Sequence, residues 1–318
     1  MLDKINEYIK NLPLEKEPRG LYEPIRYILS LGGKRIRPVL MTMAYELWRD
    51  DSERVLPLAV ALETFHNFTL LHDDVMDHAD MRRGMPTVHK KWDENTAILS
   101  GDNMLVLAFK WMQQCPADKM PAVLKVFTDT AIEIDEGQQY DVDFESRDDV
   151  REEEYIEMIR LKTSVLLACA VKIGAIMADA PADDTENLYK FGEAIGLSFQ
   201  LQDDYLDVYG NPKVFGKAIG GDITSNKKTY MLINAFNKAE GADKEELTHW
   251  IEAKDFDREE KVKAVTDIYN KLGIDKMAKA KMEQYYTEAI AYLDKVNVSD
   301  DKKKALKQYA DMMMKREK

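Results

Sequence analysis

The sequence predicts an all-α fold, a single large helical bundle, from three observations. Apolar residues recur at three- and four-residue steps along most of the chain, and the alternation typical of strands is nearly absent. Glycine (15) and proline (10) are scarce for 318 residues, which disfavours a turn-rich sheet protein. Apolar residues make up 45% of the chain, enough for a sizeable core. Because it has no low-complexity linker or fixed-period repeat, residues 1–318 are expected to form one domain.

The helices are expected from this periodicity in order along the chain. Gly32-Gly33 ends the first, Pro38 opens the second as its first residue, and a long apolar series with interspersed alanines forms the third. The expected ranges are 21–31, 38–48, 56–77, 95–113, 119–138, 152–178, 184–209, 227–238, 243–253, 258–293 and 301–316. The informative connections between them are 82–86, 141–149 and 209–225.

Charge and cysteine content exclude several classes of function. The 45 Lys and Arg against 58 Asp and Glu give a net charge of −13, which argues against a nucleic-acid binder or an anionic-membrane coat. Two cysteines cannot form a disulfide framework. The charged N-terminus does not resemble a signal peptide, and the most apolar stretch, 165–178, is too short to span a bilayer. We therefore expect a cytoplasmic protein with no nucleic-acid partner and no stable membrane insertion.

One acidic pattern, D-D-x-x-D, occurs twice, each time after an apolar helical stretch. The copies cover residues 73–77 and 203–207. In each, the first and last aspartates share one helix face, where like charges repel unless a cation offsets them. Hard oxygen ligands suit Mg²⁺, whose shell is usually completed by substrate phosphates. A solvated acidic face would explain one such cluster, but two matching clusters favour a Mg²⁺-dependent polyphosphate site.

Basic residues near these clusters form the other half of an anion site. Three cations lie within 34–37 at a helix start, where backbone N–H groups and the helix dipole favour an anion. Cations there are also common helix caps, so this segment alone is moderate support. Further candidates at other positions are Arg82, Arg83, Lys162, Thr163, Lys217 and Lys227. Cations interleaved with metal-binding carboxylates point to a small-molecule site for two phosphorylated groups.

Five motifs in order make the chain resemble the trans-isoprenyl diphosphate synthases, the polyprenyl synthetase family. They are G-G-K-R-I-R-P at 32–38, H-D-D-V-M-D with M-R-R-G-M-P-T at 72–87, L-K-T at 161–163, and F-Q-L-Q-D-D-Y-L-D at 199–207. The match in order and spacing runs from about residue 20 to residue 235. The resemblance implies the isoprenoid synthase-like bundle with a central active-site cavity, assembled as a homodimer. It also implies a prenyltransferase that condenses isopentenyl diphosphate head-to-tail (1′-4) with an allylic diphosphate.

The resemblance also implies roles for individual residues. Direct ligands of Mg²⁺, three ions in each active site, would be Asp73, Asp77 and Asp203, with Asp74, Asp204 and Asp207 in support. Isopentenyl diphosphate would be held by Lys34, Arg37, His66 and Arg83. The allylic diphosphate would be held by Arg82, Lys162, Thr163, Gln200, Lys217 and Lys227, with Gln138 and Asp141 lining the cleft. Catalysis would depend on the metal ligands together with Arg82, Lys162, Thr163, Gln200 and Lys217.

Phe68 and Thr69, about one helical turn before Asp73, are expected to control product length. In this family a bulky residue five before the first aspartate forms a floor for the growing chain. The resemblance therefore predicts a short product, most like C20 (geranylgeranyl), with C15 (farnesyl) or a longer polyprenyl chain as alternatives. The alternative is that Phe68 is an ordinary residue of the helix core.

Three other functions remain open at this point. Glu63-x-x-His66 and Glu246-x-x-His249 have the spacing used by di-iron carboxylate bundles, although such a protein would leave the cations at 34–37 unexplained. A terpene cyclase shares one D-D-x-x-D motif but usually has a different second acidic motif. A non-catalytic partner subunit would not need both acidic clusters intact.

Overall fold

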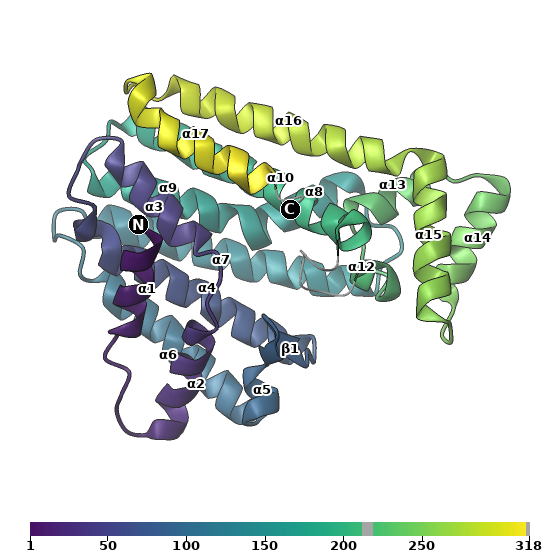
Figure 1. Cartoon of the computed structure of the whole chain (residues 1–318), viewed down its shortest axis with the longest axis horizontal. Helices are drawn as coiled ribbons and strands as arrows, with labels where there is room; N and C mark the ends of the chain where they lie inside the picture. The colour runs from purple at the N-terminus through teal and green to yellow at the C-terminus, as the bar shows by residue number, and fades with distance from the viewer. Residues whose placement is uncertain (212–218, 316–318) are drawn as a thin grey trace. The chain divides into compact units, whose positions relative to one another are not determined.

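A computed structural model of the chain, which describes residues 1–211 and 219–315, confirms the all-α fold class (Figure 1). Among these residues the one sheet is a two-stranded hairpin. The chain divides into two compact units. Unit 1 contains residues 1–128, 169–188 and 297–306, and unit 2 contains residues 129–168, 189–296 and 307–318. The expectation of one domain over the whole chain stays a prediction.

Unit 1 is built mainly from the first elements of the chain. These are α1 (Leu2–Lys10), α2 (Arg19–Ser30), α3 (Ile36–Glu46), the 3₁₀ turn η1 (Ser52–Val55), α4 (Leu56–Met76), β1 (Met81–Arg82), β2 (Met85–Pro86), α5 (Val88–Lys91) and α6 (Glu94–Met112). The helices α1, α2, α3 and α6 all pack against α4. Because α4 is apolar around most of its circumference, it forms the centre of this unit, and Leu58 and Leu62 are fully buried.

Four helices contribute residues to both units: α7 (Met120–Glu145), α9 (Val165–Met177), α10 (Ala182–Tyr209) and α17 (Asp300–Met314). Elements of unit 2 alone are α8 (Glu152–Ile159), the π turn η2 (Arg160–Ser164), α12 (Gly221–Thr224), α13 (Tyr230–Lys238), α14 (Gly241–Glu252), α15 (Arg258–Leu272) and α16 (Ile274–Lys295). Figure 1 shows α14 and α15 side by side, and the two helices pack together. None of the helices in the described ranges is both long and apolar enough to cross a membrane.

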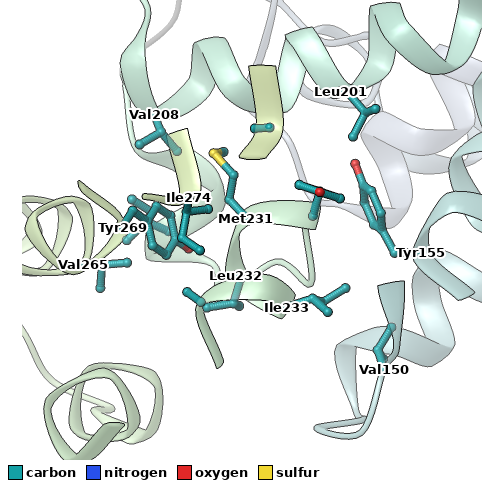
Figure 2. Packing of buried hydrophobic residues seen from close by; sticks show 14 of the residues in the cluster. Val150, Tyr155, Leu201, Val208, Met231, Leu232, Ile233, Val265, Tyr269 and Ile274 are labelled. Atoms are coloured by element: carbon teal, nitrogen blue, oxygen red, sulfur yellow. The ribbon is translucent and has the colours of Figure 1, made fainter. Parts of the chain in front are cut away.

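The hydrophobic core of unit 2 joins side chains from α8, α10, α13, α15 and α16 (Figure 2). Figure 2 shows Tyr269 and Ile274 lying close together, with Met231 between them and the Tyr155 side of the cluster. Burying a large apolar side chain stabilises the fold by about 1.5–3 kcal/mol. This core includes Tyr155 of α8 and Leu201 of α10, two residues before Asp203.

Two expected helices are each interrupted in the structure. The range 152–178 contains the π turn η2, so α8 and α9 are separate α-helices joined by a wider turn. The range 258–293 breaks at Gly273, whose φ of 70° lies in the left-handed region that ends a helix. Gly273 indicates the end of a helix within an otherwise continuous apolar pattern, because glycine is common at helix C-termini.

Several expected boundaries also move, among them the end of the helix before Asp141 and the start of the helix at Pro38. Helix α7 continues to Glu145, so Asp141 lies within a helix and not in a connection. Helix α3 begins at Ile36, which makes Pro38 its third residue instead of its first. Helix α7 is therefore longer than expected, whereas α3 is shifted by two residues at the same length.

Candidate active site

The first acidic cluster lies at the C-terminal end of α4. Asp73 and Asp74 are in its last turn, and Asp77 caps it, donating its N–H to the Asp73 carbonyl oxygen at 2.8 Å. Asp73 is half-buried and Asp77 is exposed. This turn contains no basic residue, so the carboxylates stand where the helix dipole favours a cation. The position therefore strengthens the case for a cation at this cluster.

The middle aspartate of this cluster is held by an arginine. Asp74 is buried, and Arg82 contacts both of its carboxylate oxygens, with Nε to Oδ2 at 2.7 Å and Nη2 to Oδ1 at 2.7 Å. The first contact is a hydrogen bond and the second is an ion-pair contact, and together they hold the two groups beside each other. Asp74 thus anchors Arg82 beside the cluster, which fits the supporting role that the sequence predicts for it.

The hairpin that follows brings two predicted motifs into contact. Its two-residue turn, Arg83-Gly84, has φ values of 52° and 75°, the pattern of a type I′ turn. The Arg83 guanidinium donates to the Gly32 carbonyl oxygen, and a Cβ on Gly33 would lie 2.9 Å from its Cζ. The glycine-rich segment at 32–38 and the arginine pair therefore form one site, although the sequence shows them only as separate motifs.

One of the three cations at 34–37 has a structural role. Arg35 forms an ion pair with Glu63 at 2.8 Å, and the two side chains are only 2% and 3% exposed. Arg35 also donates to the Leu29 carbonyl oxygen at 2.7 Å. Lys34, by contrast, is exposed, and Arg37 is half-buried. Because Glu63 pairs with Arg35, the first E-x-x-H motif lacks the available carboxylate that a di-iron site requires.

His66 lies among the arginines of unit 1. Burial lowers its pKa well below the ordinary value, and the positive charges of Arg37, Arg83, Arg82 and Arg35 lower it further. His66 is therefore a neutral imidazole at physiological pH, able to donate one hydrogen bond to a phosphate oxygen. Three of the four residues predicted to hold isopentenyl diphosphate come together here.

An aromatic series leads from the acidic end of α4 toward its middle. The Phe68 ring lies 4.8 Å from the His72 ring and 5.6 Å from the Phe65 ring, measured between centroids. Phe68 and Thr69 are half-buried, whereas Phe65 is buried. The positions of Phe68 and Thr69 one turn from the carboxylates are as the sequence predicts.

The second acidic cluster lies at the C-terminal end of α10, whose last turn also contains no basic residue. Asp203 is half-buried and Asp204 is buried. Asp207 accepts a hydrogen bond from the Asp222 N–H on its Oδ2 at 2.8 Å, and its carbonyl oxygen accepts one from Gly220 at 2.6 Å. Asp207 therefore connects the start of α12 to the end of α10 by two hydrogen bonds.

Asp204 accepts hydrogen bonds from neutral groups. Gln200 donates from Nε2 to Oδ1 at 2.9 Å, and the Tyr155 hydroxyl donates to Oδ2. Burial raises the pKa of Asp204 to about 6, although the charge of Lys227 and both hydrogen bonds act in the opposite direction. The Thr163 hydroxyl donates to Gln200 Oε1 at 3.1 Å. Two predicted ligands of the allylic diphosphate, Thr163 and Gln200, are thus connected to Asp204 by successive hydrogen bonds.

Lys162 and Lys227 surround Asp141 on α7. Lys162 donates to Asp141 Oδ2 at 2.7 Å. Burial alone would raise the pKa of Asp141, but the charges of Lys227 and Lys162 bring it below its ordinary value. Gln138, one turn earlier on α7, is half-buried. The remaining predicted cation, Lys217, lies outside the described residues.

The comparison with known families gives a direct assignment. The sequence profile of the polyprenyl synthetase family matches residues 18–269. The chain belongs to the polyprenyl synthetase family. The predicted site residues, from Lys34 to Lys227, all lie within this matched range.

Several members of the polyprenyl synthetase family are similar to this chain over most of their length. The geranylgeranyl diphosphate synthase of Methanosarcina mazei is 45% identical over 229 residues, covering 71% of this chain and 70% of the relative. The geranylfarnesyl diphosphate synthase of Natronomonas pharaonis is 40% identical over 262 residues, 76% of each chain. A crystal structure of a geranylgeranyl pyrophosphate synthase superposes with a TM-score of 0.94 at 42% identity, covering 100% of this chain and 99% of the other. The chain is accordingly a prenyltransferase, of a family that is generally Mg²⁺-dependent and uses isopentenyl and allylic diphosphates.

Each unit of this polyprenyl synthetase contains some of the predicted site residues. Unit 1 contains Lys34, Arg37, His66, Asp73, Asp77, Arg82 and Arg83, and unit 2 contains Lys162, Thr163, Gln200, Asp203 and Lys227. Within the described ranges, no three His, Cys, Asp or Glu side chains form a complete metal site. Carboxylate oxygens suit Mg²⁺, which usually keeps waters and takes substrate phosphate oxygens. Sequence reasoning missed Tyr155, for which no local pattern exists.

Proposed function

We propose that this polyprenyl synthetase condenses isopentenyl diphosphate with an allylic diphosphate in a Mg²⁺-dependent head-to-tail (1′-4) reaction. The proposed product is a short all-trans prenyl diphosphate, geranylgeranyl diphosphate (C20). One observation carries the proposal: each D-D-x-x-D lies at the end of a helix with no basic residue in its last turn, and a cation from another segment acts on its middle aspartate, Arg82 on Asp74 and Lys227 on Asp204. Carboxylates for a metal and separate cations for phosphate are what a metal-bridged diphosphate needs.

The proposed metal ligands are Asp73, Asp77 and Asp203, for three Mg²⁺ ions in each active site. When bound, Mg²⁺ supplies Lewis-acid stabilisation of the charge that develops on the departing pyrophosphate. Asp74 and Asp204 support this set through the contacts with Arg82 and Gln200.

Isopentenyl diphosphate is assigned to Lys34, Arg37, His66 and Arg83. The guanidinium groups offer paired donors that match phosphate oxygens. Neutral His66 adds a hydrogen bond without further charge repulsion among the arginines. This diphosphate stays attached to its carbon chain during the reaction, so its ligands mainly fix position.

The allylic diphosphate is assigned to Arg82, Lys162, Thr163, Gln200, Lys217 and Lys227. Its C–O bond breaks first, and the arginine and lysines of this set stabilise the negative charge on the pyrophosphate. The Thr163 hydroxyl and the Gln200 amide would face the allylic cation, which the isopentenyl double bond attacks. The proton lost afterwards passes to the released pyrophosphate. Apolar surroundings protect the cation from water.

An assay with purified protein tests the proposal. Mg²⁺, isopentenyl diphosphate and each allylic starter are supplied in turn, and the products are sized by chromatography. We expect chain extension that stops at C20 and that disappears on chelation of Mg²⁺. Failure to extend any starter would refute the proposal, and extension to C15 or beyond C20 would correct only the product length.

Phe68 is the proposed floor for the growing chain. Beneath it, the Phe65 ring is 5.2 Å from the Phe127 ring, so the floor rests on buried aromatic side chains. We expect Phe68→Ala to give longer products, and Phe68→Leu, which retains more bulk, to shift them less. Product lengths equal to those of the unaltered protein in both variants would remove Phe68 as the floor.

The homodimer and the cytoplasmic location remain part of the proposal. Sedimentation velocity tests the first: a dimer has twice the 36.6 kDa mass of one chain.

A further inference from the structure

Lys162 and Thr163 lie in a π turn, a rare form that takes one residue more than an α-helical turn and is frequent at functional sites. The Ser164 hydroxyl donates to the Ile159 carbonyl oxygen, five residues back, at 3.4 Å. Because such a turn is less favourable than a continuous α-helix, neighbouring elements must hold it. In unit 2 these elements are α7 and α10.

Helix α7 holds the Lys162 side of the turn through two residues four apart on one face. A Cβ on Gly137 would collide with the Lys162 backbone nitrogen and lie 2.8 Å from the Leu161 carbonyl carbon. One helical turn later, Asp141 accepts the hydrogen bond from Lys162 Nζ at 2.7 Å. Gly137 thus sets how closely α7 approaches the turn, and Asp141 sets where the amine points.

Helix α10 repeats this arrangement for Thr163. A Cβ on Gly196 would lie 2.6 Å from the Ser164 Cα and 2.8 Å from its Cβ. One helical turn later, Gln200 accepts the hydrogen bond from the Thr163 hydroxyl at 3.1 Å. A glycine followed after one turn by a polar acceptor therefore occurs on both helices that contact the π turn.

We propose that Gly137 and Gly196 are positioning residues, which let α7 and α10 close on the π turn and so place Lys162 and Thr163 for the allylic diphosphate. This inference rests on the proposed function, because it takes these two side chains to hold that substrate. Backbone contacts cannot relax as a flexible side chain does, so an added methyl group must shift the turn itself. A displacement of about 1 Å at a positioning group lowers the rate about 100-fold.

The test compares Gly137→Ala and Gly196→Ala with the unaltered protein. For each we expect the KM for the allylic diphosphate to rise about 10-fold and kcat to fall, because the turn is displaced. The KM for isopentenyl diphosphate, which is assigned to residues of unit 1, should stay within about twofold. A merely structural role would lower the folded fraction, and hence kcat, without changing either KM.

Gly174→Ala is the matched control. A Cβ on Gly174 would collide with the Met41 carbonyl oxygen and lie 3.1 Å from the Ala44 Cβ, so the added methyl is equally crowded. None of these residues is assigned to a substrate. We expect this variant to lose thermal stability as the other two do, and to keep both KM values.

A double variant guards against failure to fold. Gly196→Ala with Ser164→Gly removes the Ser164 Cβ and hydroxyl, which would lie 2.8 Å and 3.0 Å from the new methyl group. The double variant should reverse part of the rise in the allylic KM that Gly196→Ala causes. It decides the question if Gly137→Ala does not fold. No chain extension by the unaltered protein refutes the proposed function. If the unaltered protein is active and its glycine variants keep the allylic KM, as Gly174→Ala is expected to do, the positioning role alone is overturned. The same holds if the double variant reverses none of the rise in the allylic KM.

Discussion

The acidic clusters of unit 1 and unit 2 share one spacing, but their middle aspartates have different partners. Asp74 contacts the Arg82 guanidinium through both oxygens. Asp204 accepts hydrogen bonds from the neutral Tyr155 hydroxyl and Gln200 amide, and burial raises its pKa to about 6. Burial disfavours the ionised form of Asp204, although the charge of Lys227 and the two hydrogen bonds act against this effect. One sequence motif therefore provides two electrostatic environments.

The cations proposed to bind diphosphate also differ between the two units. Unit 1 has arginines around His66, and the described part of unit 2 has Lys162 and Lys227 near Asp141. A guanidinium is a rigid fork that fixes phosphate orientation, whereas an ammonium is a compact charge on a flexible stem. Under the proposed function, the diphosphate that remains attached is held mainly by geometry. The one that departs is held by the charges of Lys162 and Lys227, with Arg82 as its one guanidinium ligand.

The largest expected effect is common to both clusters. Asp73→Asn and Asp203→Asn each remove a proposed metal ligand while preserving side-chain volume. We expect kcat/KM to fall at least about 100-fold in each, because metal stabilisation of the leaving group is worth several kcal/mol. The exposed aspartates Asp118 and Asp255 serve as controls, and their Asn variants should retain activity. A large loss of kcat/KM in only one of these two variants would show that the two clusters do not contribute equally to metal binding.

An exchange of cation types tests the difference between the units. Arg82→Lys keeps the charge but loses one of the two contacts with Asp74, so kcat/KM for the allylic diphosphate should fall about 10-fold. Lys227→Arg keeps a charge whose geometry is less constrained, and we expect less than about a threefold change. Steady-state kinetics with varied allylic diphosphate measures both. Equal tolerance of the two exchanges would contradict the assignment of geometry to unit 1 and charge to unit 2.

Local patterns in the sequence are sufficient to predict most of the helices and both acidic clusters. Helix α4 is an example, because its apolar spacing and its D-D-x-x-D lie within one continuous segment. The break at Gly273 was also readable, since glycine is the common residue at a helix C-terminus. The π turn at 160–164 was not readable, because its apolar neighbours continue the helical pattern on both sides.

The partners within the site could not be predicted, because they depend on contacts between distant segments. Tyr155 meets Asp204 only through the packing of α8 in the core of unit 2. Arg35 and Arg37 are the same residue type two positions apart, yet Arg35 is buried in an ion pair with Glu63 and Arg37 is only half-buried. Burial and pairing of this kind arise from tertiary structure, which residue spacing does not encode.

The smallest expected effect is on stability, and it has opposite signs in the two clusters. Asp74→Asn breaks the contact with Arg82, so we expect the free energy of unfolding at pH 8 to fall by about 1–3 kcal/mol, less than for a fully buried pair because Arg82 is partly exposed. Asp204→Asn removes a carboxylate whose ionised form burial disfavours, and Asn can retain the bond from Gln200. We expect this variant to be more stable than the unaltered protein at pH 8.

The pH dependence separates this explanation from a general effect of the substitution. Between about pH 4 and pH 6 Asp204 is protonated in the folded chain and ionised in the unfolded chain. The unaltered protein therefore loses up to about 1.4 kcal/mol per pH unit as the pH rises through this window. The advantage of Asp204→Asn should be near zero at pH 4, grow through the window and stay constant above pH 6, in urea denaturation of chelator-treated protein. If Asp204→Asn instead loses stability at pH 8 as Asp74→Asn does, Asp204 is held as a paired carboxylate, and the two clusters are electrostatically alike.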